Sequence, residues 1–153
     1  MATEEEPHYL ETLYGELALA LGDAVWAFAR IEWLTYEYLG RLSTDQIDEL
    51  VPDLGFRQRT SIIRRLVHRK SADAEKRSKA LAAIKEIEDL SEQRNIIVHN
   101  PWRIWIDLDA EEFMTEIQKY SNRERKVDLS SLKVFAEKCG NAEAQFVEAV
   151  NAL

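Results

Sequence analysis

Three residues close together in the chain have side chains suited to proton transfer and to binding an anion. Arg94, Asn95 and His99 lie within six residues of one another, shortly before Pro101. In a helix, at about 100° per residue, Asn95 and His99 are neighbours and flank Arg94 on one broad face. An imidazole titrates near neutral pH, and a guanidinium holds a carboxylate or phosphate with a fork of donors. The spacing therefore predicts that the three side chains address one cleft.

The position of Arg94 in its helix strengthens this prediction. We expect one long helix from Ala72 to Val98, which ends there because Pro101 forces Asn100 out of the α region. An apolar stripe of this helix lies within about 60° of Arg94 on either side; it consists of Ala80, Ala83, Ile87, Leu90, Ile97 and Val98. A guanidinium beside an apolar seam needs a carboxylate or phosphate partner. We therefore expect the Arg94 side chain to have an anionic partner rather than to be simply exposed on the surface.

Glu32 poses the same problem on the first helix, which we expect to run from Tyr9 to Leu42. It lies about 40° from Phe28, inside an apolar stripe that should face the core. The stripe consists of Leu10, Tyr14, Leu17, Leu21, Ala24, Val25, Phe28, Ile31, Thr35, Leu39 and Leu42. Because an unpaired carboxylate is costly there, we predict that Glu32 orients Arg94 or a neighbouring group. A buried ion pair without any chemistry is the alternative.

A second face of the first helix has small residues at spacings of seven. Gly15, Gly22 and Ala29 alternate with Trp26 and Trp33. This pattern suits the close approach of another helix beside large aromatic side chains. The helix should therefore contact two partners, which are either a second subunit and the core or several helices of a monomeric bundle.

The other elements predict a single helical domain. They are a short helix Thr44–Leu50, a helix Phe56–His68 and a final helix that begins near Asp128 or Ser130. From Trp102 to Leu108, apolar and polar residues alternate with the period of a strand. The expected fold class is all-α, with residues 1–153 in one up-and-down bundle of four to five helices. A short hairpin or irregular insertion is expected at about 102–126.

Charge is distributed unevenly along the chain. The 153 residues have a formal net charge of −8, so an anionic ligand needs a local basic site. Residues 57–79 hold nine Lys and Arg against two Asp and Glu. We predict RNA-binding contacts from this run and from one aromatic ring that could stack on bases: Arg64, Arg65, Arg69, Lys70 and Trp102. A solvated helix face is the alternative for the basic run, and packing over the end of the bundle is the alternative for Trp102.

The composition excludes several classes of protein. A single cysteine, Cys139, excludes an intrachain disulfide and a multi-cysteine metal site. The longest apolar stretch, Leu17–Ala29, is interrupted by Gly22 and Asp23 and is too short to cross a membrane. The acidic start has no signal-peptide pattern, so we expect a cytoplasmic protein. We find no glycine-rich phosphate loop, no paired histidines at metal-ligand spacing and no Gly-x-Ser-x-Gly motif, and we expect neither metal nor cofactor.

The segment Leu90–Trp102 resembles the HEPN superfamily, whose signature is Arg, a polar residue, several further residues and His at the end of a helix. Arg94, Asn95 and His99 match that signature. The core HEPN fold is a bundle of four or five helices, and the predicted helices, with the motif on the penultimate long one, resemble it over most of the chain. The segment Trp102–Lys126 is longer than that core fold requires.

This resemblance implies a metal-independent endoribonuclease that acts as a homodimer, with two motif helices meeting across a two-fold cleft. RNA supplies its own nucleophile, the 2′-hydroxyl, so cleavage would give a 2′,3′-cyclic phosphate. His99 would transfer the proton, Arg94 would hold the non-bridging oxygens, and Asn95 would bind the phosphate or fix the imidazole tautomer. Glu88 and Glu92 fall on the same helix face, which predicts a cleft of mixed charge.

The resemblance also extends to partners, and two other functions stay open. The family includes toxins of toxin–antitoxin or defence systems, where a small nucleotidyltransferase often silences the toxin, so such an antitoxin protein is an expected partner. The first alternative function is a noncatalytic HEPN-like module that binds a nucleotide, RNA or protein through the same cleft. The second is a structural helical dimer without a ligand, in which His99 only interacts with the last carbonyls of its helix.

Overall fold

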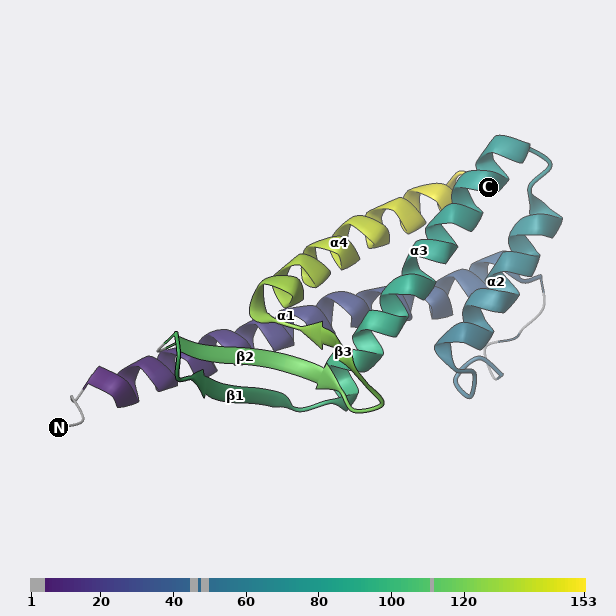
Figure 1. The fold of residues 1–153 in the computed structure, drawn as a ribbon. Coiled ribbons are helices and arrows are strands. Elements are labelled where there is room, and N and C mark those ends of the chain that lie inside the picture. Colours follow the sequence, from purple (N-terminus) through teal and green to yellow (C-terminus); the bar gives the residue numbers. More distant parts are fainter. Residues whose placement is uncertain (1–4, 45–46, 48–49, 111) are drawn as a thin grey trace.

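The computed structural model of the protein describes residues 5–44, 47, 50–110 and 112–153. Within these ranges the chain forms α1 (Glu5–Leu42), α2 (Phe56–Lys70), α3 (Ala74–His99), β1 (Trp102–Asp107), β2 (Glu112–Lys119), β3 (Asn122–Val127) and α4 (Leu129–Asn151) (Figure 1). The helices lie beside one another, and the strands form a separate small sheet near one end of α3 (Figure 1). Nowhere in the described ranges does a helix combine the length and the apolar character needed to cross a membrane.

The mainly helical architecture is confirmed, with several elements longer than predicted. α1 begins at Glu5 rather than at Tyr9, and α2 continues to Lys70 rather than ending at His68. α3 ends at His99, so the whole of the Arg94–His99 motif is helical. The predicted short helix Thr44–Leu50 lies for the most part outside the described residues.

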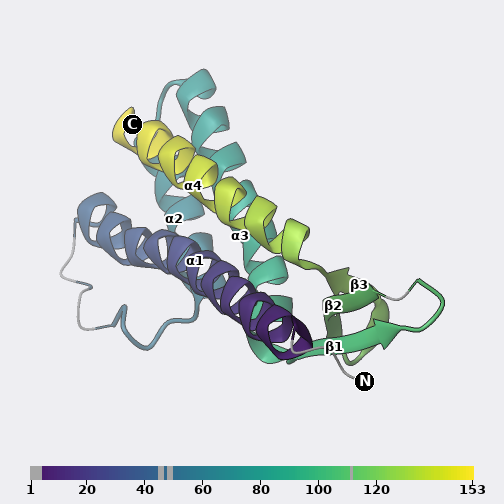
Figure 2. The ribbon, with the colours of Figure 1, turned by 90° about the vertical axis from the view of Figure 1, so that its left-hand side faces the viewer.

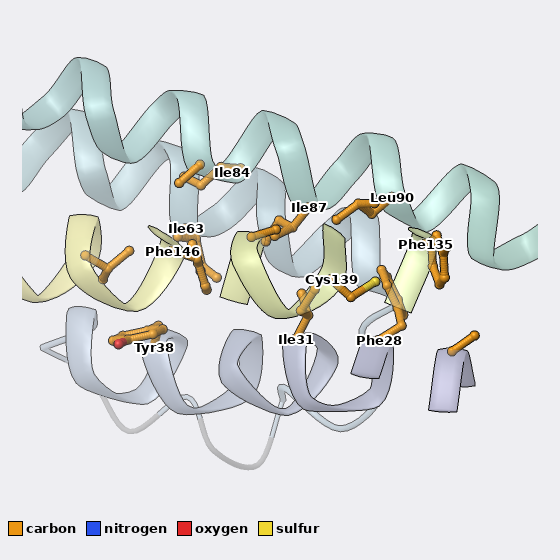
Figure 3. Packing of buried hydrophobic residues seen from close by; sticks show 14 of the residues in the cluster. Phe28, Ile31, Tyr38, Ile63, Ile84, Ile87, Leu90, Phe135, Cys139 and Phe146 are labelled. Carbon is orange, nitrogen blue, oxygen red and sulfur yellow. The ribbon is translucent and has the colours of Figure 1, made fainter. Parts of the chain in front are cut away.

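The core lies between the helices, and all four contribute to it (Figure 3). Phe28 of α1 stacks on Phe135 of α4 at 6.5 Å between ring centroids, and Tyr38 meets the edge of Phe146 at 5.2 Å. Burial of each such side chain contributes about 1.5–3 kcal/mol. Cys139 is also fully buried here, and burial raises the pKa of its thiol to about 12. This apolar layer fixes the spacing between α1 and α3, on which the motif depends.

The two predicted faces of α1 are separate in the structure. Most of the apolar stripe is buried or partly buried, but Tyr14 and Val25 are exposed. Both lie toward the margin of the stripe, at about 40° and 60° from Phe28. The second face, with Trp26 and Trp33, is exposed to solvent. Figure 2 shows α1 along one edge of the bundle.

The helix ends follow the local sequence. The Asp73 side chain accepts hydrogen bonds from the first-turn amides of α3, and the Asp128 side chain accepts one from the Ser131 amide at 2.6 Å. That hydrogen bond is the main reason why the pKa of Asp128 lies below its ordinary value of 3.8. Asn100 is extended, at φ −128° and ψ 139°, as expected for a residue before Pro101.

The segment after α3 is a three-stranded antiparallel sheet, whereas a short hairpin or an irregular insertion was expected. The strand order is β1-β2-β3, with Trp102 opposite Ile117 and Ile117 opposite Val127. Ile117 is fully buried, and it joins the sheet to the helical core. The alternating sequence of β1 predicted a strand. β2 and β3 are dominated by charged and polar residues, so no such pattern predicted them. The fold is therefore mainly helical with one small sheet.

Candidate functional site

Arg94 lies on α3 at the contact with α1, and its side chain is held from three sides. Its Nη2 donates to the two carboxylate oxygens of Glu32 at 3.3 and 3.2 Å, and its Nη1 donates to Asn95 Oδ1 at 3.1 Å. The guanidinium carbon lies 5.6 Å from the centre of the Phe28 ring. The predicted contact between Glu32 and Arg94 is therefore present. Both side chains keep about a quarter of their surface exposed, at 28% for Arg94 and 27% for Glu32.

The motif residues line two adjoining hollows rather than one cleft. Arg94 borders a hollow of about 430 Å³ between α1, α2 and α3. His99 borders a groove of about 510 Å³ at the end of α3, and Asn95 lines both. The prediction of a single cleft is thus corrected: the contact with Glu32 holds Arg94 on the α1 side, whereas His99 is exposed more than a turn further along the helix.

The sheet forms the second wall of the His99 groove. The Tyr120 amide donates to Asn100 Oδ1 at 3.2 Å, while Asn100 Nδ2 donates to the Ile96 carbonyl oxygen at 2.8 Å. These bonds tie the β2–β3 turn to the last turn of α3. An irregularity in the β2–β3 register between Gln118 and Lys119 precedes the turn. As a result, Lys119 and Tyr120 lie beside His99 in the wall of one groove.

The groove is positively charged on balance, which the sequence did not predict. Arg57, Lys119 and Arg125 line it with His99, and they come from α2, β2 and β3. Glu92 is the carboxylate of the lining, and Arg57 Nη2 binds it at 2.6 Å. The charges of Arg57 and Glu92 offset each other, and those of Lys119 and Arg125 remain to attract an anion.

A second carboxylate of the motif face is neutralised in the same way. Glu88 lies one turn before Glu92 on α3, and its Oε2 accepts a hydrogen bond from Arg64 Nη2 at 2.8 Å. α2 therefore supplies one arginine to each acidic residue that the sequence placed on this face. Of the two predicted carboxylates, Glu92 lines the groove and Glu88 lines neither hollow, and both are paired.

The residues predicted to bind RNA do not gather at the motif. Arg64 pairs with Glu88, and Arg65, Arg69 and Lys70 are in part or fully exposed further along α2. α2 and α3 run in opposite directions, so the end of α2 lies at the far end of α3 from His99 (Figure 1). An RNA contact by these side chains stays a prediction, and it would be remote from the groove.

Trp102 also lies away from any exposed stacking position. Its ring is partly buried against the hydrophobic core, and its Nε1 is buried without a hydrogen-bond partner among the described atoms. Tyr120, by contrast, is 86% exposed at the groove. The ring of Tyr120 is therefore available for stacking on a base at the groove.

Arg59 shows that the basic run is not a uniform surface patch. It is only 3% exposed, and its Nε and Nη1 donate at 2.8 Å to the hydroxyls of Thr35 and Tyr36. Nη1 also donates to the Leu54 carbonyl oxygen, and the guanidinium stacks on the Tyr36 ring at 3.8 Å. Burial lowers the pKa of Arg59 below its ordinary value. This side chain joins α2 to α1 and has no place in an anion site.

Four groove residues were missed from the sequence, namely Arg57, Lys119, Tyr120 and Arg125. Arg57 was counted in the basic run but not assigned to the motif, and the other three lie about 20 to 30 residues beyond it. No period or motif links them to His99, because the link is the fold of the sheet. Among the described residues, no group of three or more His, Cys, Asp or Glu side chains is arranged to hold a metal ion.

Comparison of the chain with models of known protein families, with curated proteins and with solved structures finds no match. The residues and their geometry are therefore the basis for a functional proposal.

Proposed function

We propose that the protein is a metal-independent endoribonuclease of HEPN type that acts as a homodimer. The observation that carries the proposal is the groove of about 510 Å³ at the end of α3, where His99 and Asn95 face cationic side chains from three other elements. A proton-transfer group, an amide donor and unpaired positive charge together suit a phosphodiester. The resemblance of the Arg94–His99 segment to the HEPN signature supports the same assignment.

The chemistry needs no group beyond the chain and the RNA. A general base removes the proton of the 2′-hydroxyl, the 2′-oxygen attacks phosphorus, and the bond from phosphorus to the 5′-oxygen breaks. A general acid gives a proton to that leaving oxygen, and the products are a 2′,3′-cyclic phosphate and a 5′-hydroxyl. His99 supplies the imidazole of the groove, the side chain that most often serves as general base or acid. In a homodimer, the two copies of His99 would act as base and acid.

The cationic residues would hold the substrate on either side of the reacting phosphate. Lys119 and Arg125 would bind phosphates along the groove, and Tyr120 would stack on a base, a contact worth about 1–3 kcal/mol and tolerant of sequence. Asn95 lines both hollows, so it would contact the reacting phosphate next to His99. Arg94 would stabilise charge on the same phosphate from the adjoining hollow. A single-stranded RNA is the substrate that this arrangement favours.

The direct test is cleavage of a fluorescent single-stranded RNA in EDTA by the purified protein and by its variants. His99→Ala should lower the cleavage rate by about 10²–10⁴-fold, the usual contribution of a general acid–base group. His68→Ala is the matched control, because His68 is also exposed but lies on α2 away from the groove. Products should end in a 2′,3′-cyclic phosphate. Equal cleavage by the wild type and His99→Ala would refute the proposal.

A noncatalytic binding module is the second candidate, and one observation favours it. Arg94 is already engaged by Glu32 and Asn95, and it borders a different hollow from His99. Such a module would not cut RNA, but added single-stranded RNA or nucleotide would raise its melting temperature. In that case neither the wild type nor His99→Ala would cleave RNA, and the variant would show a smaller increase in melting temperature.

We further propose that the ribonuclease acts as a toxin, and this role has a separate test in cells. Induced expression of an active ribonuclease should arrest growth, and His99→Ala and Arg94→Ala should relieve the arrest at equal protein levels. The expected antitoxin, a nucleotidyltransferase-type protein, would be sought among the neighbouring genes. Growth arrest that persists in His99→Ala would contradict a ribonuclease toxin.

A further inference from the structure

One face of α1 is apolar, exposed and regularly spaced. Six residues define it, and we refer to them as the α1 stripe: Gly15, Leu19, Gly22, Trp26, Ala29 and Trp33. All six are exposed, with Leu19 at 69%, Trp26 at 71% and Trp33 at 67% of their surface accessible. Their alternating spacing of four and three residues is that of a coiled-coil seam. The stripe lies on the helix at the edge of the bundle (Figure 2).

The two glycines of the stripe have no purpose within the described chain. A Cβ atom added to Gly15 or Gly22 would meet no atom within 4 Å. Glycine inside a helix is destabilising relative to alanine. The fold itself therefore does not call for glycine at these positions, whereas a second helix that approaches the backbone closely would require it.

We infer that two copies of the chain associate through the α1 stripe, with their α1 helices antiparallel. Large and small residues each repeat every seven positions. In one antiparallel register every large residue faces a small one of the other copy, and two-fold symmetry provides each contact twice. The facing residues are Trp33 with Gly15, Trp26 with Gly22, and Leu19 with Ala29. A parallel pair in register would instead oppose Trp to Trp and leave gaps between the glycines.

Charges beside the stripe complement one another in this register. Arg30 and Glu16 lie on the same flank, and the antiparallel pairing brings Arg30 of one copy opposite Glu16 of the other. The Arg30 side chain is 51% exposed, and its Nε donates to Glu143 at 2.8 Å. A guanidinium has five donors, so it can also bind a second carboxylate. Asp23 is the exception, because it faces its own copy at the two-fold axis and weakens the association.

The apolar area of the stripe is sufficient for a specific interface. Each tryptophan has roughly 150–250 Å² of surface to bury, and both are about two-thirds exposed. Two copies of the stripe, with both tryptophans and Leu19, therefore offer on the order of 1,000 Å². This is the smallest area expected for a specific association, so we expect a dimer that dissociates at micromolar concentrations.

The pairing also places the two motif sites relative to each other, and this step rests on the proposed function. Glu32 lies on the flank of α1 opposite to Arg30, and it binds Arg94. In an antiparallel pair like flanks meet, so both Glu32–Arg94 pairs lie on the same side of the dimer. In this register the two-fold axis crosses α1 at the level of residue 24. Eight residues separate Glu32 from that level, so the two pairs are about 24 Å apart along the helices. A parallel pair would put them on opposite sides.

Sedimentation equilibrium over about 1–200 µM protein tests the association by itself, without RNA. The wild type should form a dimer, and Gly22→Leu or Trp33→Glu should raise its dissociation constant at least tenfold. Asp23→Asn should lower it. Gly140→Leu and Leu108→Glu are the matched controls, because Gly140 also has open space at its Cβ position and Leu108 is also exposed outside the stripe. The controls should leave the dissociation constant within about twofold.

A spin label at Glu37→Cys tests the orientation by pulsed electron paramagnetic resonance. Residue 37 lies 13 positions from the axis level, so the antiparallel pair predicts about 40 Å between labels. A parallel pair predicts less than about 20 Å. A monomeric wild type, a dimer insensitive to Gly22→Leu and Trp33→Glu, or a short label distance would each overturn the inference. A dimer that behaves as expected but leaves RNA intact would instead refute the ribonuclease.

Discussion

Two arginines lie against α1, and they differ in exposure and in the groups that accept their hydrogen bonds. Arg59 is 3% exposed, and uncharged oxygens accept its hydrogen bonds. Arg94 is 28% exposed, is balanced by the carboxylate of Glu32 and borders a hollow. A cation buried among acceptors of the protein itself leaves no room for a ligand, whereas a partly exposed one keeps donors for an anion. Position at a helix seam does not distinguish the two arginines, but their exposure and their acceptors do.

The largest expected effect is the loss of stability in Arg59→Ala. The substitution leaves the Thr35 and Tyr36 hydroxyls and the Leu54 carbonyl oxygen without their donor in the interior, and it removes the stacked guanidinium. We expect the free energy of unfolding to fall by about 3–4 kcal/mol, which corresponds to a decrease of roughly 10 °C in melting temperature for a chain of this size. Calorimetry measures it. A decrease of less than about 2 °C in melting temperature would contradict the structural role of Arg59.

Arg94→Ala should lower the rate of RNA cleavage strongly and the stability only slightly. The ion pair with Glu32 is partly solvated, so its loss should lower the free energy of unfolding by about 1 kcal/mol or less. The rate of RNA cleavage should fall by about 10²–10³-fold, as when a donor that stabilises transition-state charge is removed. Melting temperature and single-turnover cleavage are measured on the same preparation. A stability loss as large as that of Arg59→Ala would make Arg94 a second structural arginine.

Lysine at each position sharpens the comparison, because it keeps the charge and removes the planar fork. Arg59→Lys should still cost about 2 kcal/mol of unfolding free energy, since one ammonium cannot satisfy acceptors on three sides and is more costly to bury. Arg94→Lys should unfold like the wild type and retain about a tenth of the cleavage rate. If both lysine variants behave alike in both assays, fork geometry does not distinguish the two sites.

The smallest expected effect comes from an exposed hydrogen bond, the one that Asp128 accepts at the start of α4. Asp128→Ala removes the cap of α4 and should cost about 1 kcal/mol of unfolding free energy at pH 7. The pKa of Asp128 is lowered in the folded state by the Ser131 amide, so its stabilisation is full above the unfolded-state value of 3.8. It is lost as the pH falls through the lower folded-state value. The difference between wild type and variant should therefore shrink below about pH 4, and a difference that grows there would contradict this assignment.

Local signals predicted the motif helix and its surroundings well. The period of α3 placed Arg94 at an apolar seam, and the same reasoning on α1 placed Glu32 opposite it, where the ion pair is found. The extended Asn100 before Pro101 followed from the steric restriction that proline imposes on its predecessor. These features depend on neighbours within one helix or on one dipeptide, which is why sequence is sufficient for them.

Features that depend on long-range contacts were missed. The position of Arg59 could have been predicted, because it precedes Ile63 by four residues on the inward face of α2. The count of charges over residues 57–79 did not separate the inward face of the helix from the outward one. Tyr120 had no such signal. Its place at the groove depends on the hydrogen bond to Asn100 and on an irregular strand register, and neither has a period in the sequence.

The single cysteine has a practical consequence for experiments on this chain. Cys139 is fully buried, and a thiol with a pKa of about 12 provides almost no thiolate at neutral pH. Alkylating reagents should therefore modify it only when the helices separate, so its labelling rate reports the opening of the bundle in native buffer. The same protection lets a newly introduced surface cysteine be labelled selectively while Cys139 stays in place.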